Sequence, residues 1–163
     1  MTARVQRILF VCLGNICRSP AAEALLRHEL AERCRDGSVE VDSAGTLSYH
    51  QGQPPDERMR QAAAERGYEI AGRSRPVVAQ DFERFDLIVA MDRSNLSDLE
   101  AMAPAGGAPI RLFSDFLPAG SPADVPDPFY GGPGGFDTVL DLLEEGCSRL
   151  ISELPGDAGP NSG

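Results

Sequence analysis

Several features that would assign the 163-residue chain to a common functional class are missing from its sequence. No apolar run approaches the ~18 residues of a membrane-spanning helix, and residues 1–6 contain no signal-peptide core. Basic residues are in the minority, 15 against 25 acidic ones, and the net charge of −10 argues against binding to nucleic acid or an anionic membrane. We therefore expect a cytoplasmic protein with neither nucleic acid nor membrane as a partner.

Cysteine and histidine are also scarce. Four cysteines in a chain of this length do not form a disulfide scaffold. The two histidines, His28 and His50, do not complete a zinc site with Cys12 and Cys17, whose spacing is also wrong for one. The turn after Cys12 lacks the final Gly-Lys-Ser/Thr of a nucleotide-binding loop. We expect no metal, no cofactor and no nucleotide.

One stretch, residues 8–23, organises the rest of the chain. Ile8–Val11 is a short apolar run, typical of a strand buried on both faces of a parallel sheet. Ser19 and Pro20 are typical of the N-cap and the first residue of a helix. Between strand and helix the backbone must turn sharply, with its N–H groups beside the positive helix end, and this geometry binds anions. The residues expected to bind a phosphate here are Leu13, Gly14, Asn15, Ile16, Cys17 and Arg18.

Cys12 and Arg18 make this predicted anion site a candidate active site. The N–H dipoles, the helix N-terminus and Arg18 all favour negative charge, so Cys12 is expected to be largely thiolate at neutral pH. Arg18 can grip two phosphate oxygens through its planar guanidinium. A thiolate at the base of a phosphate cradle is a nucleophile for phosphoryl transfer. The alternative, a buried structural cysteine, accounts less well for the arginine six residues on and for the flanking strand and Ser-Pro pair.

Hydrophobic patterning in the rest of the chain predicts strands that alternate with helices. We expect strands at 8–11, 39–42, 87–91 and 110–112, a helical turn at 81–85, and helices at 20–35, 56–66, 92–102 and 137–153. On the helix that Asp92 opens, Leu96, Leu99 and Met102 are expected to share the apolar face. One domain is expected to span residues 1–154, followed by a disordered tail at 155–163.

Two loops are expected to complete the site. Ligands of such sheets lie beyond the carboxyl ends of the strands, so the loop 47–55 can wall the pocket, with Tyr49 against a substrate ring. Tyr49 could equally be an ordinary exposed residue, and His50 is expected at the surface.

Cleaving a phosphate ester also requires a proton donor. The long irregular stretch 113–135 offers Asp115, Asp124 and Asp127, and the residues alone leave this choice open, although two prolines flank Asp127.

The chain resembles the low-molecular-weight protein tyrosine phosphatases, from about Arg7 to Leu154. The resemblance rests on the loop Cys12–Ser19, on Asp42-Ser43-Ala44-Gly45-Thr46, on Met91-Asp92 with Ser94-Asn95-Leu96, and on Asp127-Pro128-Phe129-Tyr130. We therefore expect a single three-layer α/β domain. Its four-stranded parallel sheet should have the order 2-1-3-4, with helices on both faces and a phosphate-binding loop after the first strand.

The resemblance implies catalytic roles for residues of the long stretch. It makes Asp127 the general acid, with Phe129 and Tyr130 at the pocket wall, where Phe129 could also anchor the loop on the core. The reaction would be metal-independent hydrolysis of an aryl phosphate through a phosphocysteine. Cys17 could form a reversible disulfide with Cys12.

The resemblance also implies supporting roles around the loop. Asn15 and Ser43 would hold the loop in shape, Ser19 would stabilise the thiolate, and Asp92 would steady Arg18. Local alternatives stay open: a left-handed turn at Asn15, a strand end at Ser43, and helix caps at Ser19 and Asp92. One departure concerns residue 72, where members of the family have a histidine in this hydrogen-bond network and this chain has glycine.

The substrate implied by the resemblance is a tyrosine-phosphorylated protein, and a tyrosine kinase of a bacterial polysaccharide-export system is one candidate. Ile16 favours phosphotyrosine, because related phosphoarginine phosphatases carry threonine there. Arsenate reductase of the same fold is a further alternative, but it needs cysteines after the third strand, and none occurs between Cys34 and Cys147. A catalytically silent phosphate-binding module would not need Cys12, Arg18 and Asp127 together.

Overall fold

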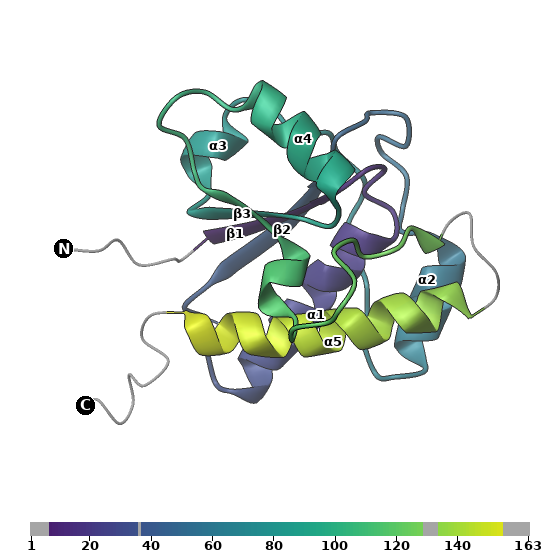
Figure 1. Ribbon diagram of the computed structural model, residues 1–163. Helices are drawn as coiled ribbons and strands as arrows, with labels where there is room; N and C mark the ends of the chain where they lie inside the picture. The colour runs from purple at the N-terminus through teal and green to yellow at the C-terminus, as the bar shows by residue number, and fades with distance from the viewer. Residues whose placement is uncertain (1–6, 36, 129–133, 155–163) are drawn as a thin grey trace.

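Four parallel strands form one sheet in the order β2-β1-β3-β4 (Figure 1). Their bounds are Arg7–Cys12 for β1, Glu40–Gly45 for β2, Leu87–Ala90 for β3 and Ile110–Leu112 for β4. The structure is a computed structural model that describes residues 7–35, 37–128 and 134–154. The strand order and the parallel pairing confirm the expected sheet.

Helices cover both faces of the sheet (Figure 1). On one face lie α1 (Arg18–Glu32) and α5 (Gly135–Glu153), and on the other lie α3 (Asp81–Arg84) and α4 (Arg93–Met102). The helix α2 (Glu57–Ala64) packs against α5, and a 3-10 turn, η1 (Phe113–Phe116), follows β4. None of the helices in the described ranges is long and apolar enough to cross a membrane.

The strand β1 runs through the middle of the core. Its side chains alternate between the faces, so that Ile8 and Phe10 join the cluster with α1 and α5, while Leu9 and Val11 join the cluster with Phe82 and α4. Because both faces are covered, the strand is apolar without interruption, as strands of parallel sheets are. Its last residue is Cys12, which places the cysteine at the carboxyl edge of the sheet.

Three local expectations were wrong. The helix α1 begins at Arg18 instead of Pro20, with Cys17 at its N-cap, and the Ser19 hydroxyl contacts Cys12 Sγ instead of capping the helix. It ends at Glu32, and Cys34 lies beyond it with a φ of 58°. Met102 is 43% exposed, whereas Leu99 is buried in the cluster and Leu96 packs against it.

Some expectations stay predictions. Phe129, Tyr130 and the expected tail at 155–163 lie outside the described residues, as do residues 1–6 of the expected domain. The expected irregular stretch after β4 contains the 3-10 turn η1 before it continues without regular structure to Asp127.

Candidate active site

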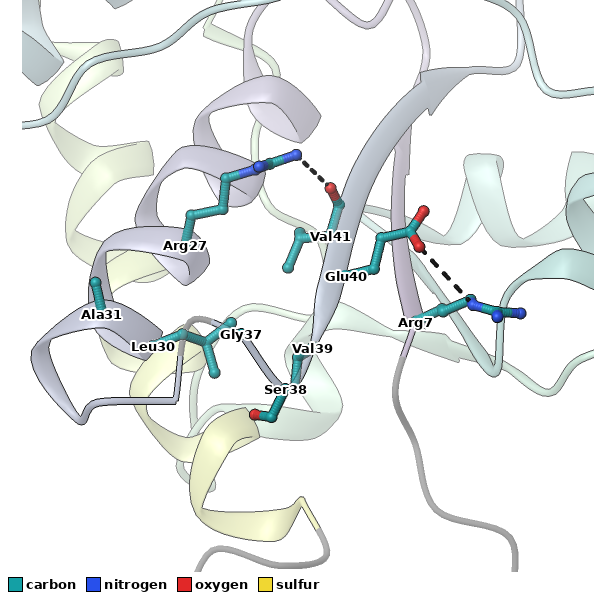
Figure 2. A pocket seen from close by; sticks show the side chains of 9 residues that line it. All are labelled: Arg7, Arg27, Leu30, Ala31, Gly37, Ser38, Val39, Glu40 and Val41. Carbon is teal, nitrogen blue, oxygen red and sulfur yellow. Dashed lines mark hydrogen bonds and ion pairs between the residues drawn. The ribbon is translucent and has the colours of Figure 1, made fainter.

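Two hollows of similar size lie at opposite ends of the sheet. One, of about 680 Å³, lies beside the first residues of β1 and β2 and is lined by Arg7, Arg27 and Glu40 (Figure 2). There Arg27 Nη2 donates to the Val41 carbonyl at 2.6 Å, which satisfies an acceptor on the open edge of β2. The other, of about 640 Å³, lies at the carboxyl edge and contains Cys12. Of these two hollows, the second is the one lined by cysteine.

The sulfur of Cys12 is surrounded by hydrogen-bond donors. Cys12 is 2% exposed, and its Sγ lies 3.0 Å from Ser19 Oγ, 3.2 Å from Asn15 N and 3.5 Å from Ser19 N. The sulfur also sits at the first turn of α1, where the helix dipole is positive. This arrangement stabilises a negatively charged sulfur.

Asn15 combines the two roles that the sequence left open. Its φ is 56°, a left-handed conformation that asparagine tolerates. Its side-chain amide donates to Ser19 Oγ at 2.8 Å and to Ser43 Oγ at 3.0 Å, and its Oδ1 accepts from Arg75 N at 3.0 Å. The side chain therefore holds a strained turn by bonds to three separate segments.

The network behind the loop ends on Glu23, which sequence reasoning did not assign. Ser43 Oγ donates to Glu23 Oε1 at 2.8 Å, and burial raises the pKa of this carboxyl above its usual value although Ser43 and Arg27 oppose the shift. Gly72 borders a small cavity of about 70 Å³ beside these residues. No sequence signal separated Glu23 from the other charged residues of its helix.

Arg18 is buried beneath the loop and held by several partners. Its Nη1 donates to Asp92 Oδ2 at 2.6 Å and to the Val125 carbonyl at 3.0 Å, and its Nη2 lies 3.5 Å from Asp127 Oδ2. Burial alone would lower the pKa of the guanidinium, but the charges of Cys12, Asp92 and Asp127 raise it above its ordinary value. Arg18 is therefore a fixed positive charge beside the sulfur.

The three aspartates of the long stretch have different surroundings. Asp127 lines the hollow and faces Arg18. Asp124 instead accepts from the Arg93 side chain and backbone, bonds that lower its pKa. Asp115 lies 3.5 Å from Arg111 Nε. Of the three, Asp127 is the one within reach of a group bound at Cys12.

The mouth of the hollow is walled mainly by the loop after β2. Tyr49 is 83% exposed, and its ring meets that of His50 edge-on at 4.8 Å. His50 was expected at the surface, but it is partly buried and packs on the loop: a Cβ at Gly14 would lie 2.8 Å from His50 Cδ2. A side chain at residue 14 would therefore displace the His50 ring. Two further lining residues, Leu47 and Gln53, belong to the same loop, 47–55, that the sequence predicts as a pocket wall.

Cys17 also lines the hollow and is the second thiol of the loop. Burial, and then the nearby charges of Asp56, Cys12 and Asp127, raise the pKa of the Cys17 thiol far above its ordinary value. Cys17 is therefore a neutral thiol at physiological pH.

The groups that converge on the hollow are suited to an oxyanion. Among the described residues, no group of three or more His, Cys, Asp or Glu side chains could hold a metal ion. The N–H groups of Asn15 and Ser19 donate instead to Cys12 Sγ, and Arg18 lines the same hollow. Backbone N–H groups and guanidinium groups bind phosphate.

Comparisons with known proteins agree with this geometry. The family model of the low molecular weight phosphotyrosine protein phosphatases matches residues 7–158. A low molecular weight protein-tyrosine-phosphatase of Streptomyces coelicolor is 40% identical over 152 residues, which cover 91% of this chain and 93% of the relative.

Solved structures show the same likeness. A protein tyrosine phosphatase from Entamoeba histolytica, with Hepes in its active site, has a TM-score of 0.87 at 45% identity, over 91% of this chain and 96% of that one. A Drosophila arginine phosphatase has a TM-score of 0.84 at 37% identity, over 89% of this chain and 95% of that one.

Proposed function

The chain belongs to the low molecular weight phosphotyrosine protein phosphatase family, and from this premise we propose that Cys12, Arg18 and Asp127 hydrolyse phosphotyrosine in proteins. Cys12 is the nucleophile, Arg18 binds the phosphoryl oxygens and Asp127 is the acid and base. The observation that carries this proposal is the set of donors around Cys12 Sγ beside the buried guanidinium of Arg18.

In the first step, the Cys12 thiolate attacks phosphorus in line with the phenolic oxygen. A phosphorus–sulfur bond forms, the phosphorus–oxygen bond breaks, and Asp127 gives its proton to the departing oxygen. Arg18 and the loop N–H groups hold the three other phosphoryl oxygens and their developing charge. Asp92 keeps the guanidinium in place through its 2.6 Å hydrogen bond.

In the second step, water attacks the phosphocysteine. Asp127, now a carboxylate, takes the proton of the water, the phosphorus–sulfur bond breaks, and inorganic phosphate leaves. The electron pair returns to Cys12 Sγ, where Asn15 N and the Ser19 hydroxyl stabilise it. The supporting network of Asn15 and Ser43 keeps the loop in the shape that both steps need.

The depth of the pocket selects the substrate. Cys12 lies at its base, while Tyr49 stands at its mouth, so a tyrosyl phosphate can reach the sulfur and a phosphoserine is too short. Ile16 adds an apolar wall that suits an aromatic ring. Phosphoarginine is the second candidate, because one structural neighbour at 37% identity is named an arginine phosphatase.

The cellular setting follows from the thiol chemistry. A nucleophilic Cys12 beside a second thiol, Cys17, requires a reducing compartment, so we place the enzyme in the cytoplasm. Its substrate is a tyrosine-phosphorylated protein, and a tyrosine kinase of a bacterial polysaccharide-export system is the partner that we propose to test first.

Two assays test this function. Turnover of p-nitrophenyl phosphate in EDTA should persist in the wild-type protein and be lost in Cys12→Ser, which should still bind inorganic phosphate. Peptides with phosphotyrosine, phosphoarginine and phosphoserine, compared side by side, should show the highest kcat/KM for phosphotyrosine. Activity of Cys12→Ser close to the wild-type value would overturn the assignment, and a preference for phosphoarginine would select the second candidate.

A further inference from the structure

The carbonyl oxygens of the phosphate loop accept hydrogen bonds from the chain that surrounds the loop. Four carbonyls of the loop accept hydrogen bonds from backbone amides of the surrounding chain. These pairs are Thr46 N to Cys12 O at 2.9 Å, Leu47 N to Leu13 O at 3.0 Å, Asp56 N to Ile16 O at 2.8 Å, and Ala21 N to Cys17 O at 3.2 Å. Backbone donors do not depend on the side chains of those residues.

Gly14 is the exception, since its carbonyl accepts from a side chain. Ser74 Oγ donates to Gly14 O at 2.9 Å, and Ser74 is 4% exposed. The same peptide unit ends in the N–H of Asn15, which donates to Cys12 Sγ at 3.2 Å. One rigid peptide plane therefore has the Ser74 hydroxyl at one end and the sulfur at the other.

We propose that Ser74 is a positioning residue for the nucleophile, because its hydroxyl fixes the peptide plane whose N–H faces Cys12 Sγ. A planar peptide rotates as one unit. A hydrogen bond that fixes the Gly14 carbonyl therefore also fixes the direction of the Asn15 N–H. A hydrogen bond to a carbonyl further polarises the N–H of its peptide and strengthens that donor. This inference rests on the proposed role of Cys12.

Ser74 is itself held on both sides, as a positioning residue must be. Its N–H donates to Gln53 O and its carbonyl accepts from Gly52 N, both at 2.8 Å, which ties it to the loop that walls the pocket.

The next residue, Arg75, donates its N–H to Asn15 Oδ1 at 3.0 Å. The Arg75 guanidinium pairs with Asp42 and Asp81 at 3.1 Å each. The segment Ser74-Arg75 is therefore held in place by bonds that do not involve the Ser74 hydroxyl.

The substitution Ser74→Ala tests the hydroxyl alone, because the backbone bonds to Gln53 and Gly52 persist. We expect kcat/KM to fall about 3- to 10-fold, the effect of one lost hydrogen bond. The pH midpoint for alkylation of Cys12 by iodoacetamide should rise by about 0.5 to 1 pH unit. Alkylation is assigned to Cys12 itself by fragmentation mass spectrometry, since Cys17 and the exposed Cys34 are free thiols too.

Ser38→Ala is the matched control. Ser38 Oγ donates to Arg35 O at 2.7 Å, so this variant loses the same kind of bond at an exposed site beside the hollow at the far end of the sheet. It should keep the wild-type activity and alkylation midpoint.

Two results separate failure of this inference from failure of the proposed function. An unchanged alkylation midpoint in Ser74→Ala would overturn the positioning role, whether activity is kept or is lost through reduced thermal stability. That outcome leaves the role of Cys12 intact as long as Cys12→Ser is inactive. An active Cys12→Ser would remove the premise as well.

Discussion

Arg18 and Asp92 are joined by a 2.6 Å hydrogen bond between Nη1 and Oδ2, although 74 positions separate them in the sequence. The second oxygen of the same carboxylate accepts from Asn95 N at 2.7 Å and caps α4. The sequence left two roles open for Asp92, as the cap of a helix or as the partner of Arg18. In the structure, Asp92 has both roles. The start of α4 is thereby tied to the guanidinium at the base of the pocket.

The two functions of Asp92 can be separated by substitution. Asparagine is a good N-cap but carries no charge, whereas alanine removes both functions. We expect kcat/KM to fall about 10- to 100-fold in both Asp92→Asn and Asp92→Ala, since each loses a charge-assisted bond to Arg18. Urea unfolding should show Asp92→Ala about 1 kcal/mol less stable than Asp92→Asn. Wild-type kcat/KM in Asp92→Asn would contradict the role in holding Arg18.

The sheet and the loop were predictable because their signals are local. An apolar run such as Ile8–Val11, followed by a turn and Ser19-Pro20, identifies a strand and a helix without knowledge of the rest of the chain. The same local reasoning failed for the hydroxyl of Ser19. A Ser-Pro pair signals a cap, but folding brings Cys12 Sγ within 3.0 Å of Ser19 Oγ.

The features of the site that the sequence did not reveal depend on contacts between segments that are distant in the chain. Ser74 and Gly14 are 60 positions apart, and no periodicity or spacing links them. The choice of the general acid among three aspartates depended on the positions of the arginines. Arg93 forms an ion pair with Asp124, whereas Arg18 faces Asp127. Without these placements, Asp127 was favoured by its two flanking prolines and selected by the family resemblance.

Removing the proposed acid should slow the enzyme without unfolding it. Asp127→Asn is expected to lose about 100- to 10,000-fold in kcat, the usual contribution of a general acid. The loss should be larger for phenyl phosphate than for p-nitrophenyl phosphate, because the poorer leaving group needs the proton more. Steady-state kinetics with both substrates measure this difference.

Asp124→Asn is the control for that experiment. Asp124 pairs with Arg93 at an exposed position, and such pairs contribute little to stability. Its kcat should stay near the wild-type value for both leaving groups. Equal losses in Asp124→Asn and Asp127→Asn would contradict the assignment of the acid.

Glu23 should make stability depend on pH. Burial raises the pKa of its carboxyl in the folded state above the unfolded value, so between these values the folded protein binds more protons. The contribution of Glu23 to the free energy of unfolding is therefore highest at low pH. It falls as the pH rises through the pKa of the Glu23 carboxyl in the folded state. Glu23→Gln removes this titration, and its side-chain oxygen can still accept from Ser43.

The measurement is urea unfolding of wild type and Glu23→Gln between pH ~4 and pH ~7. The variant should gain stability relative to the wild type as the pH rises. Glu100→Gln, a substitution at an exposed position of α4, serves as the matched control and should run parallel to the wild type. A wild-type advantage that grows with pH would contradict the burial argument.

Cys34 occupies a position that favours glycine. The end of α1 is closed by Cys34 N to Ala31 O at 3.0 Å and Arg35 N to Leu30 O at 2.7 Å, a Schellman pattern in which residue 34 has a φ of 58°. In this conformation the Cβ of an L-residue crowds the backbone. We expect Cys34→Gly to raise the free energy of unfolding by about 0.5 to 1 kcal/mol.

Thermal and urea unfolding under reducing conditions measure this gain, and Cys34→Ala is the control that keeps the Cβ. Because Cys34 is exposed and far from Cys12 in the fold, neither variant should change kcat/KM. Glycine should stabilise the protein while alanine should not, since only glycine relieves the contact between Cβ and backbone. Equal stability of the two variants would show that the left-handed conformation at residue 34 is not strained.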